Sequence, residues 1–330
     1  MSAIALISQA PPRVRGNIAA FIAMVFWATG FPAVAIILET WHPLLLAPAR
    51  FGLAAVALLV FTVLATGPGS LRQLTQRTWR DIWWIGGGLL MLSTVLLLYG
   101  QSLVHPVTVS VIISMLPLHS ALAGMIAGTE RMTLVLAFGI FLSLVGGVIV
   151  SVGPDLLLHA KSRGVEVGSD ATADTIRTWY GPGFVLAGVV LFVAYSRACD
   201  QRLGMLGGAG KAGLTMAAGT VVVSGLALAA VMGEIVPAQL DLSPSTLMLI
   251  FWLGFGAIAA SMALWFTAIR LTGMTITAMH HNLVPFYVIV LSLAGGGVIA
   301  LHHWLGAGLV VLGAIVAQLG PDWHDAENSV

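Results

Sequence analysis

The stretch NIAAFIAMVFWATGFPAVAIIL, residues 17–38, decides the fold, because its 22 residues include no charged side chain. The hydrocarbon core of a bilayer is about 30 Å thick, and about 20 helical residues cross it. The stretch is longer than the apolar segment of a secretory signal peptide, and no small-residue cleavage motif follows it. It therefore predicts an uncleaved membrane-spanning helix.

Nine further apolar runs of similar length follow along the chain. Hydrophobic residues make up 58% of the 330 residues and charged residues only 8%, whereas about 25% of a soluble domain is charged. Each run must be helical, since an unpaired backbone group in lipid is too costly to leave. We predict an all-α membrane protein with ten transmembrane helices, at residues 17–38, 43–65, 82–102, 106–127, 132–151, 181–200, 212–232, 245–269, 274–294 and 299–319.

The Lys and Arg residues favour one orientation of these helices, because cytoplasmic loops are enriched in both. With the amino terminus inside, ten of them fall in cytoplasmic segments and three outside. The sequence thus predicts a multi-pass protein of the bacterial inner membrane with both termini cytoplasmic. The inside set is Arg13, Arg15, Arg72, Arg77, Arg80, Arg131, Arg197, Arg202, Lys211 and Arg270, and the outside set is Lys161, Arg163 and Arg177.

An internal repeat divides the chain into halves of five helices each. Pro117 and Pro285 lie in the middle of their runs, 168 residues apart, and the same offset places Ser114 on Asn282. Because five is odd, the second half must enter the membrane inverted, as in many secondary transporters. The predicted organisation is a first repeat (1–151), a periplasmic loop (152–180), an inverted repeat (181–320) and a cytoplasmic tail (321–330), with a central cavity between the repeats.

Four aromatic residues inside the runs are candidates for that cavity. Membrane Trp and Tyr side chains usually lie at the interfaces, and a buried hydroxyl or indole N–H needs a partner. Lipid-facing or packing roles are the alternative for each. The candidates are Trp27, Tyr99, Tyr195 and Trp265.

Ser114, His281 and Asn282 are the polar candidates. A polar side chain near the bilayer centre is costly unless it faces an interior or a wet cavity. Helix–helix hydrogen bonding is the alternative for Ser114 and Asn282, and a packed, structural role for His281. A histidine titrates near neutral pH, so His281 is the candidate for proton coupling, with an uncoupled facilitator equally open.

Arg50 is the only charge well inside a run, and such residues are functional candidates by default. Pairing with Glu39, at the end of the first run, or with backbone carbonyls is the structural alternative. Pro32, Pro117 and Pro285 are candidate hinges, since neighbouring helices tolerate helix breakers in membranes. Static packing is the alternative for these prolines.

Several short motifs follow one another in a characteristic order along the ten runs. They are Arg50, Leu116-Pro117-Leu118, Gly128-Thr129-Glu130-Arg131, Gly139, Gly146-Gly147 and Ala263-Leu264-Trp265-Phe266-Thr267-Ala268-Ile269-Arg270. The ordered set resembles the EamA-type branch of the drug/metabolite transporter (DMT) superfamily. Within that branch it is most similar to the YddG-type aromatic amino acid exporters. The chain departs from the family after the ninth run, where Gly295-Gly296-Gly297-Val298 replaces the expected Glu.

The resemblance implies a secondary transporter that exports small metabolites, aromatic or other hydrophobic amino acids, by alternating access. A multidrug or nucleobase exporter on the same fold is the alternative. An intramembrane acyl- or lipid-modifying enzyme would need a carboxylate beside its nucleophile and base, and no Asp or Glu lies deep in any run. We expect no enzyme activity, cofactor, metal site or nucleic-acid partner. The expected partners are a small-molecule substrate and membrane lipid, for a monomer or homodimer.

Overall fold

The computed structural model describes residues 10–67, 69, 74–126, 128, 133–151, 180–237, 240–296 and 298–318. These residues are helical throughout their regular structure, with no strand among them. The predicted all-α class is therefore confirmed. Most of the predicted loop (152–180), the tail (321–330) and the side chains of Glu130, Lys161, Arg163 and Arg177 lie outside the described residues.

Eight helical stretches of the described chain are long and apolar enough to cross a membrane. Two further apolar stretches, Ala137–Gly146 and Leu301–Gly313, are shorter. The multi-pass membrane fold is thus confirmed, while the count of ten stays a prediction. The eight stretches are Pro12–Ile37, Pro43–Thr66, Gln76–Leu103, Pro106–Ile126, Gly181–Arg202, Gly208–Met232, Pro244–Thr272 and Ile276–Ala294.

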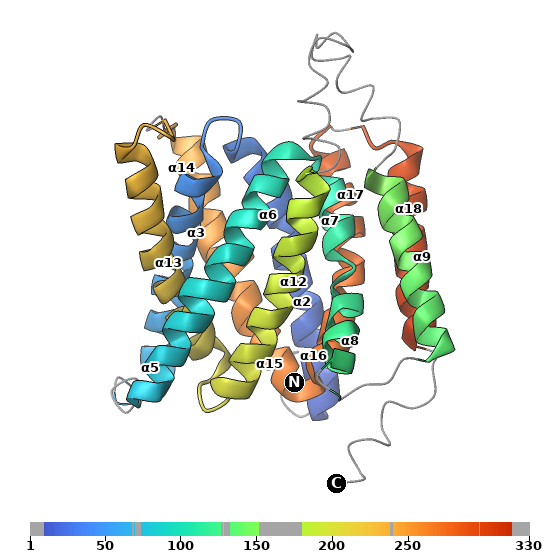
Figure 1. Cartoon of the computed structure of the whole chain (residues 1–330), viewed down its shortest axis with the longest axis horizontal. Coiled ribbons are helices and arrows are strands. Elements are labelled where there is room, and N and C mark those ends of the chain that lie inside the picture. Colours follow the sequence, from blue (N-terminus) through green and yellow to red (C-terminus); the bar gives the residue numbers. More distant parts are fainter. Residues whose placement is uncertain are drawn as a thin grey trace, which may run out of the picture.

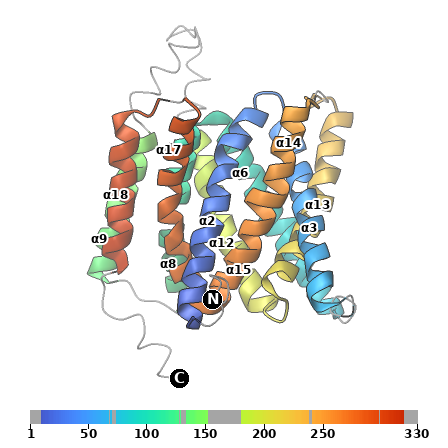
Figure 2. The same ribbon diagram turned by 180° about the vertical axis from the view of Figure 1, so that it is seen from behind.

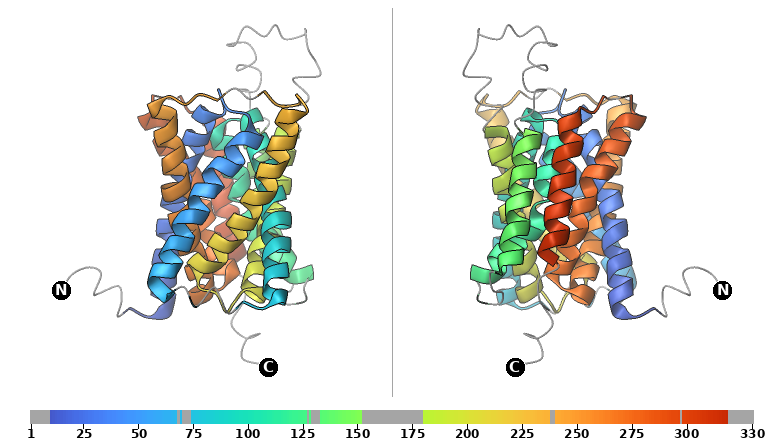
Figure 3. Two further views of the ribbon diagram at one scale, coloured as in Figure 1. Left: turned by 90° about the vertical axis from the view of Figure 1, so that its left-hand side faces the viewer. Right: turned by 90° about the vertical axis from the view of Figure 1, so that its right-hand side faces the viewer.

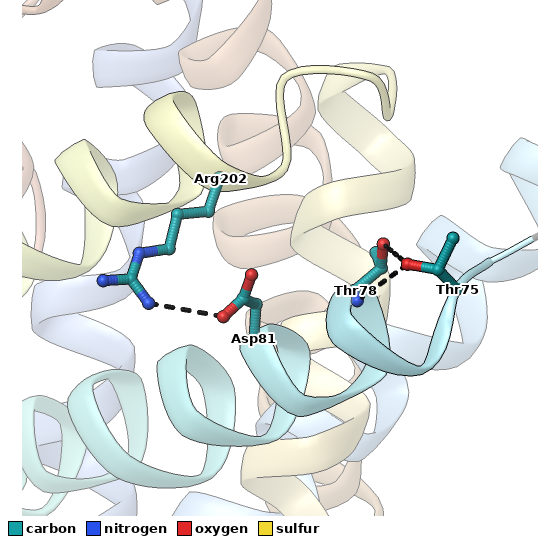
Figure 4. Close-up of polar contacts among 4 residues, drawn as sticks. All are labelled: Thr75, Thr78, Asp81 and Arg202. Atoms are coloured by element: carbon teal, nitrogen blue, oxygen red, sulfur yellow. Dashed lines mark hydrogen bonds and ion pairs between the residues drawn. The ribbon is translucent and has the colours of Figure 1, made fainter.

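Within the first half, the elements follow the predicted runs closely. The third stretch begins earlier than predicted, with α5, because Thr75 caps it by accepting a hydrogen bond from the Thr78 N–H at 3.2 Å (Figure 4). The elements are α2 (Pro12–Ile37), α3 (Pro43–Thr66), α5 (Gln76–Ile82), the π-helix η1 (Trp83–Leu90), α6 (Met91–Leu103), α7 (Pro106–Ile113), α8 (Leu116–Ile126) and α9 (Leu134–Ser151).

The second half also contains α-helices and one π-helix, with a 3-10 helix, η4, in addition. α13 begins at Gly208 rather than at the predicted 212, because Lys211 is buried in its first turns instead of lying in a polar flank. The elements are α12 (Gly181–Arg202), α13 (Gly208–Met232), α14 (Pro244–Trp252), the π-helix η3 (Leu253–Ala260), α15 (Ser261–Thr272), α16 (Met274–Met279), the 3-10 helix η4 (His280–Leu283), α17 (Val284–Ala294) and α18 (Leu301–Gln318).

The helices form one bundle whose two sides are shown in Figures 1 and 2. α3 packs on α13 at one side, α9 on α18 at the other, and α2, α6, α12 and α15 lie between them. α2 begins and α18 ends at the same end of the bundle, which we call the lower end (Figures 1 and 3). The α2–α3 connection lies at the opposite, upper end.

Two of the membrane-spanning stretches are broken next to the mid-run prolines Pro117 and Pro285. A turn at Ser114 and Met115 separates α7 from α8, and η4 separates α16 from α17. Pro117 and Pro285 are the second residues of α8 and α17, where a missing N–H costs no hydrogen bond. Pro32 differs, because α2 continues through it.

Glycines in both π-helices allow neighbouring helices to approach closely. A Cβ added to Gly86 would lie 2.1 Å from the carbonyl oxygen of Thr215 in α13. One added to Gly254 would lie 2.5 Å from Cβ of Leu53 and 3.2 Å from the carbonyl oxygen of Arg50, both in α3. Each π-helix therefore fixes the position of one of the two packed helices α3 and α13.

A polar contact joins the two halves near the lower end of the bundle. Arg202, the last residue of α12, lies with its Nη1 3.3 Å from Oδ1 of Asp81 in α5. Figure 4 shows this ion pair beside the Thr75 cap. The Arg202 side chain is more than half exposed, so the pair contributes little stability.

Candidate substrate cavity

A cavity of about 70 Å³ lies inside the bundle, between helices of both halves. Its walls come from α2, α3, η1, α6 and α7 in the first half and from α12, α13, η3 and α15 in the second. Most of the lining is aliphatic. The aromatic lining residues are Trp27, Phe31, Phe51 and Phe192, and those with polar side chains are Arg50, Ser93, Thr94, Gln101 and Ser261.

Trp27 joins the cavity to an aromatic cluster behind it. Its ring centroid lies 5.1 Å from that of Phe192, 5.1 Å from that of His281 and 6.4 Å from that of Trp265. Trp265 and His281 are fully buried with centroids 4.8 Å apart. The structure thus brings three of the predicted residues, from α2, α15 and η4, into one group, of which Trp27 alone lines the cavity.

The partners of Trp265 and His281 differ. The indole N–H of Trp265 points to Oγ of Ser196 at 3.4 Å. Neither ring nitrogen of His281 makes a well-aligned hydrogen bond with another described residue, although the Ala278 backbone is close to the imidazole. A buried polar group with a poor partner is costly.

Tyr195 lies in the same interior but outside the cavity lining. Its hydroxyl is 3.0 Å from Oγ1 of Thr215, and its ring packs against Phe192 and Phe266. Its polar end is therefore satisfied within the bundle.

Ser114 and Asn282 both lie at the helix breaks and not among the residues that line the cavity. Ser114 donates to the carbonyl oxygen of Val111 at 2.6 Å. Asn282 is buried, and its Oδ1 has no hydrogen-bond partner among the described residues. Both breaks thus carry a polar side chain, as the offset of 168 residues predicted.

Tyr99 lies near the upper end of the bundle, apart from the aromatic cluster. Its ring meets that of His42 edge-on, with centroids 5.6 Å apart. His42 caps α3 by accepting the Leu44 N–H at Nδ1, 3.3 Å away. Burial lowers the pKa of the His42 imidazole, which favours the neutral form that this cap requires.

Arg50 lines the cavity and is only 8% exposed. The structure contains no ion pair between its guanidinium and Glu39 or any other described carboxylate, so the expected structural pairing is absent from the described residues. Its Nε has no hydrogen-bond partner there, and its Cζ lies 5.1 Å from the centroid of the Phe51 ring. The cavity therefore contains a buried cation without a described counter-ion.

Several lining residues were missed by the sequence reasoning. Ser93, Thr94, Leu97 and Gln101 lie on one face of α6 at helical spacing. Small polar residues with that spacing are also typical of helix–helix packing in membranes, so the spacing alone is not specific to a cavity.

Comparisons with known proteins show similarity to transporters. Residues 14–152 match the EamA-like transporter family. A protein of Streptantibioticus cattleyicolor, described as a probable terminal-alkyne amino-acid exporter, is 28% identical over 250 residues, which cover 73% of this chain and 76% of that protein.

A crystal structure of a protein with 19% identity has the same fold, with a TM-score of 0.67 over 93% of this chain and 97% of the other. The family match, the exporter relative and the apolar helices agree with one another. The chain is a multi-pass membrane transporter whose residues 14–152 are similar to the EamA-like transporter family.

Proposed function

We propose that the protein exports small metabolites, specifically aromatic or other hydrophobic amino acids. The observation that carries this proposal is the cavity, which has four aromatic rings, mostly aliphatic walls and a few polar groups. Such a site suits a ligand with an apolar body and a small polar end. The relative described as a probable amino-acid exporter supports the same substrate class, and so does the similarity to YddG-type exporters.

Transport by alternating access between two inverted repeats is the second part of the proposal. π-helices η1 and η3 occupy corresponding places in the two halves, and so do the helix breaks at Ser114 and at η4. α2 packs on α15 and η3 as α12 packs on α6 and η1. These correspondences support a first repeat (1–151) and an inverted second repeat (181–320), with ten spans in all.

Movement of the bundle is required by the size of the cavity. A volume of about 70 Å³ admits a few water molecules, and an aromatic amino acid is larger. The helices must therefore move apart before such a substrate can enter the cavity. Pro32, Pro117 and Pro285 are the proposed hinges. Trp27 would contact the substrate directly, with Trp265 and His281 behind it. Tyr99, Ser114, Tyr195 and Asn282 would meet the substrate only after such a rearrangement.

The proposed orientation in the inner membrane has both termini in the cytoplasm. The charge bias of the sequence supports it, as does the position of the start of α2 and the end of α18 at one end of the bundle. Reporter fusions at Thr75 and Ser329 should read cytoplasmic, and one at Ser169 periplasmic. A periplasmic reading at Ser329 would contradict an even number of spans.

One experiment tests the transport proposal and its coupling. Purified protein in proteoliposomes is given a panel of labelled amino acids, with and without a proton gradient. We expect uptake of aromatic or hydrophobic amino acids by the wild type. If His281 couples protons, His281→Gln will flatten the pH dependence while substrate still binds. Exchange at equal pH without gradient-driven accumulation would instead establish a facilitator. Absence of any amino-acid flux would refute the proposed function.

A further inference from the structure

Resting on the proposed function, we propose that Arg50 binds the carboxylate of the substrate. In addition, the cavity selects hydrophobic monocarboxylates whether or not they carry an amine. This extends the substrate class from hydrophobic amino acids to organic acids with an apolar body, and it assigns the polar end of the ligand to one side chain.

The state of Arg50 is the first step. A guanidinium remains charged at any physiological pH, and burying a charge without a partner is strongly unfavourable. The Phe51 ring, 5.1 Å away, offers a weak cation–π contact that does not replace a counter-ion. Since no described carboxylate pairs with Arg50, an anion in the cavity would relieve this cost. A carboxylate matches the planar fork of the guanidinium in a bidentate geometry.

The second step is that the cavity lining lacks a carboxylate to pair with a ligand ammonium. The described residues that line the cavity include no Asp or Glu. A ligand ammonium would find only hydroxyls, the Gln101 amide and ring faces, and it would be repelled by the positive charge of Arg50. The cavity is therefore complementary to the acid end of an amino acid and offers no counter-charge to its amine.

The third step places the ligand between Arg50 and Trp27, which line the same cavity. Arg50 is the eighth residue of α3, counted from the upper end, and Trp27 is ten residues from the upper end of α2. At 1.5 Å per residue these positions lie roughly 10 and 15 Å below the upper ends of their helices. A ligand carboxylate at Arg50 would thus leave its ring at the depth of Trp27 and Phe192.

Three ligands that share one ring test this assignment on the unaltered protein. Phenylalanine, 3-phenylpropionate and phenethylamine differ in their polar ends, which are zwitterionic, anionic and cationic at pH 7. Binding is measured by isothermal titration calorimetry with the full chain in detergent micelles. We expect 3-phenylpropionate to bind at least as tightly as phenylalanine, because the ammonium of phenylalanine finds no counter-charge in the cavity. We expect phenethylamine to bind roughly 10- to 100-fold more weakly, the range for hydrogen bonds to charged groups.

Variants then locate the effect. Arg50→Gln should weaken 3-phenylpropionate roughly 10- to 100-fold and remove the preference for the acid over the amine, with Arg50→Lys in between. Arg202→Gln is the matched control, because it removes an Arg charge at the lower end of the bundle, outside the cavity. It should leave all three affinities unchanged.

The outcomes separate this inference from the proposed function. Equal binding of the amine and the acid, or phenylalanine binding without 3-phenylpropionate, would overturn the role of Arg50 and leave amino-acid export standing. Unchanged affinities in Arg50→Gln would do the same. If none of the three ligands binds, the proposal that the substrate is aromatic is refuted. If Arg50→Gln does not fold, the three-ligand series on the wild type decides.

Discussion

Arg50 in α3 and Lys211 in α13 are both buried cations, on two helices that pack together, yet their surroundings differ. Lys211 is 3% exposed; its Nζ lies 3.3 Å from Oδ1 of Asp200 and 5.1 Å from the centroid of the Phe266 ring. Arg50 is 8% exposed, lines the cavity, and has a cation–π contact with the Phe51 ring but no ion pair among the described residues. The fold provides a counter-charge for one cation and leaves the other to a ligand.

The same kind of contact positions both cations. Gly86 of η1 lies against the backbone of α13 at Thr215, one helical turn from Lys211, and Gly254 of η3 lies against α3 beside Arg50. Because both contacts involve backbone or Cβ atoms, neither helix can shift without separating from its π-helix. The difference between the two cations therefore comes from their side-chain partners and not from looser packing around one of them.

The largest predicted effect is on the helix that carries Lys211. Gly86→Ala would place a Cβ 2.1 Å from the Thr215 carbonyl oxygen, a contact that forces the backbones apart. We expect a loss of about 3 kcal/mol, at the upper end for overpacking. The readouts are the thermal midpoint in detergent and the yield of monodisperse protein.

Gly225→Ala, also in α13, is the matched control. A Cβ there meets nothing within 4 Å, and Ala favours a helix over Gly by about 1 kcal/mol. This variant should therefore be as stable as the wild type or slightly more stable. Equal thermal midpoints for the two variants would contradict the close-contact account.

A smaller effect is expected for the counter-charge of Lys211. Asp200→Asn leaves Lys211 buried without its carboxylate, which for a fully buried pair is strongly destabilising. Since the Asp200 side chain is 45% exposed, solvent screens the pair and we expect a loss of about 1–2 kcal/mol. Lys211→Met, which removes the buried charge itself, should cost less. A thermal midpoint lower for Lys211→Met than for Asp200→Asn would show that the pair contributes mainly through lysine packing.

Much of the fold was predictable because lipid leaves the backbone few choices. An apolar run of about 20 residues must be helical, so the helices follow the runs. Lys211 shows where this fails. A charge at the end of a run was interpreted as the start of a polar flank, but Asp200 on α12 allows it to be buried. The π-helices were not predicted, since a run of apolar and small residues gives the same hydropathy in either helix type.

The candidate site was predictable only in part. The sequence indicates how deep in the membrane a residue lies better than it indicates which way its side chain points. Trp27 and Arg50 were noted for being unusual inside a span, and both line the cavity. Tyr99 was equally unusual, yet it meets His42 at the upper end, and this contact depends on a turn that hydropathy does not describe. Thr94 and Gln101 were missed, since nothing in their residue types separates a cavity-facing position from helix packing.

The last prediction removes the unpaired cation itself. Arg50→Met replaces a buried charge by an apolar side chain of similar length, and it breaks no ion pair among the described residues. Replacing buried charged groups by apolar ones is often neutral or stabilising, so we expect the ligand-free protein to gain about 1 kcal/mol.

The gain should appear as a higher thermal midpoint without ligand, together with loss of the stabilisation that 3-phenylpropionate gives to the wild type. A ligand that binds only the folded state raises the midpoint by mass action, so the two readouts report the charge and the site separately. Lys211→Met is the comparison, because it leaves Asp200 without its cation and should not stabilise the protein. If Arg50→Met instead lowers the midpoint by as much as Asp200→Asn, Arg50 has a structural partner after all, and the contrast between the two cations fails. A binding site that costs stability when empty is expected where function needs an uncompensated group.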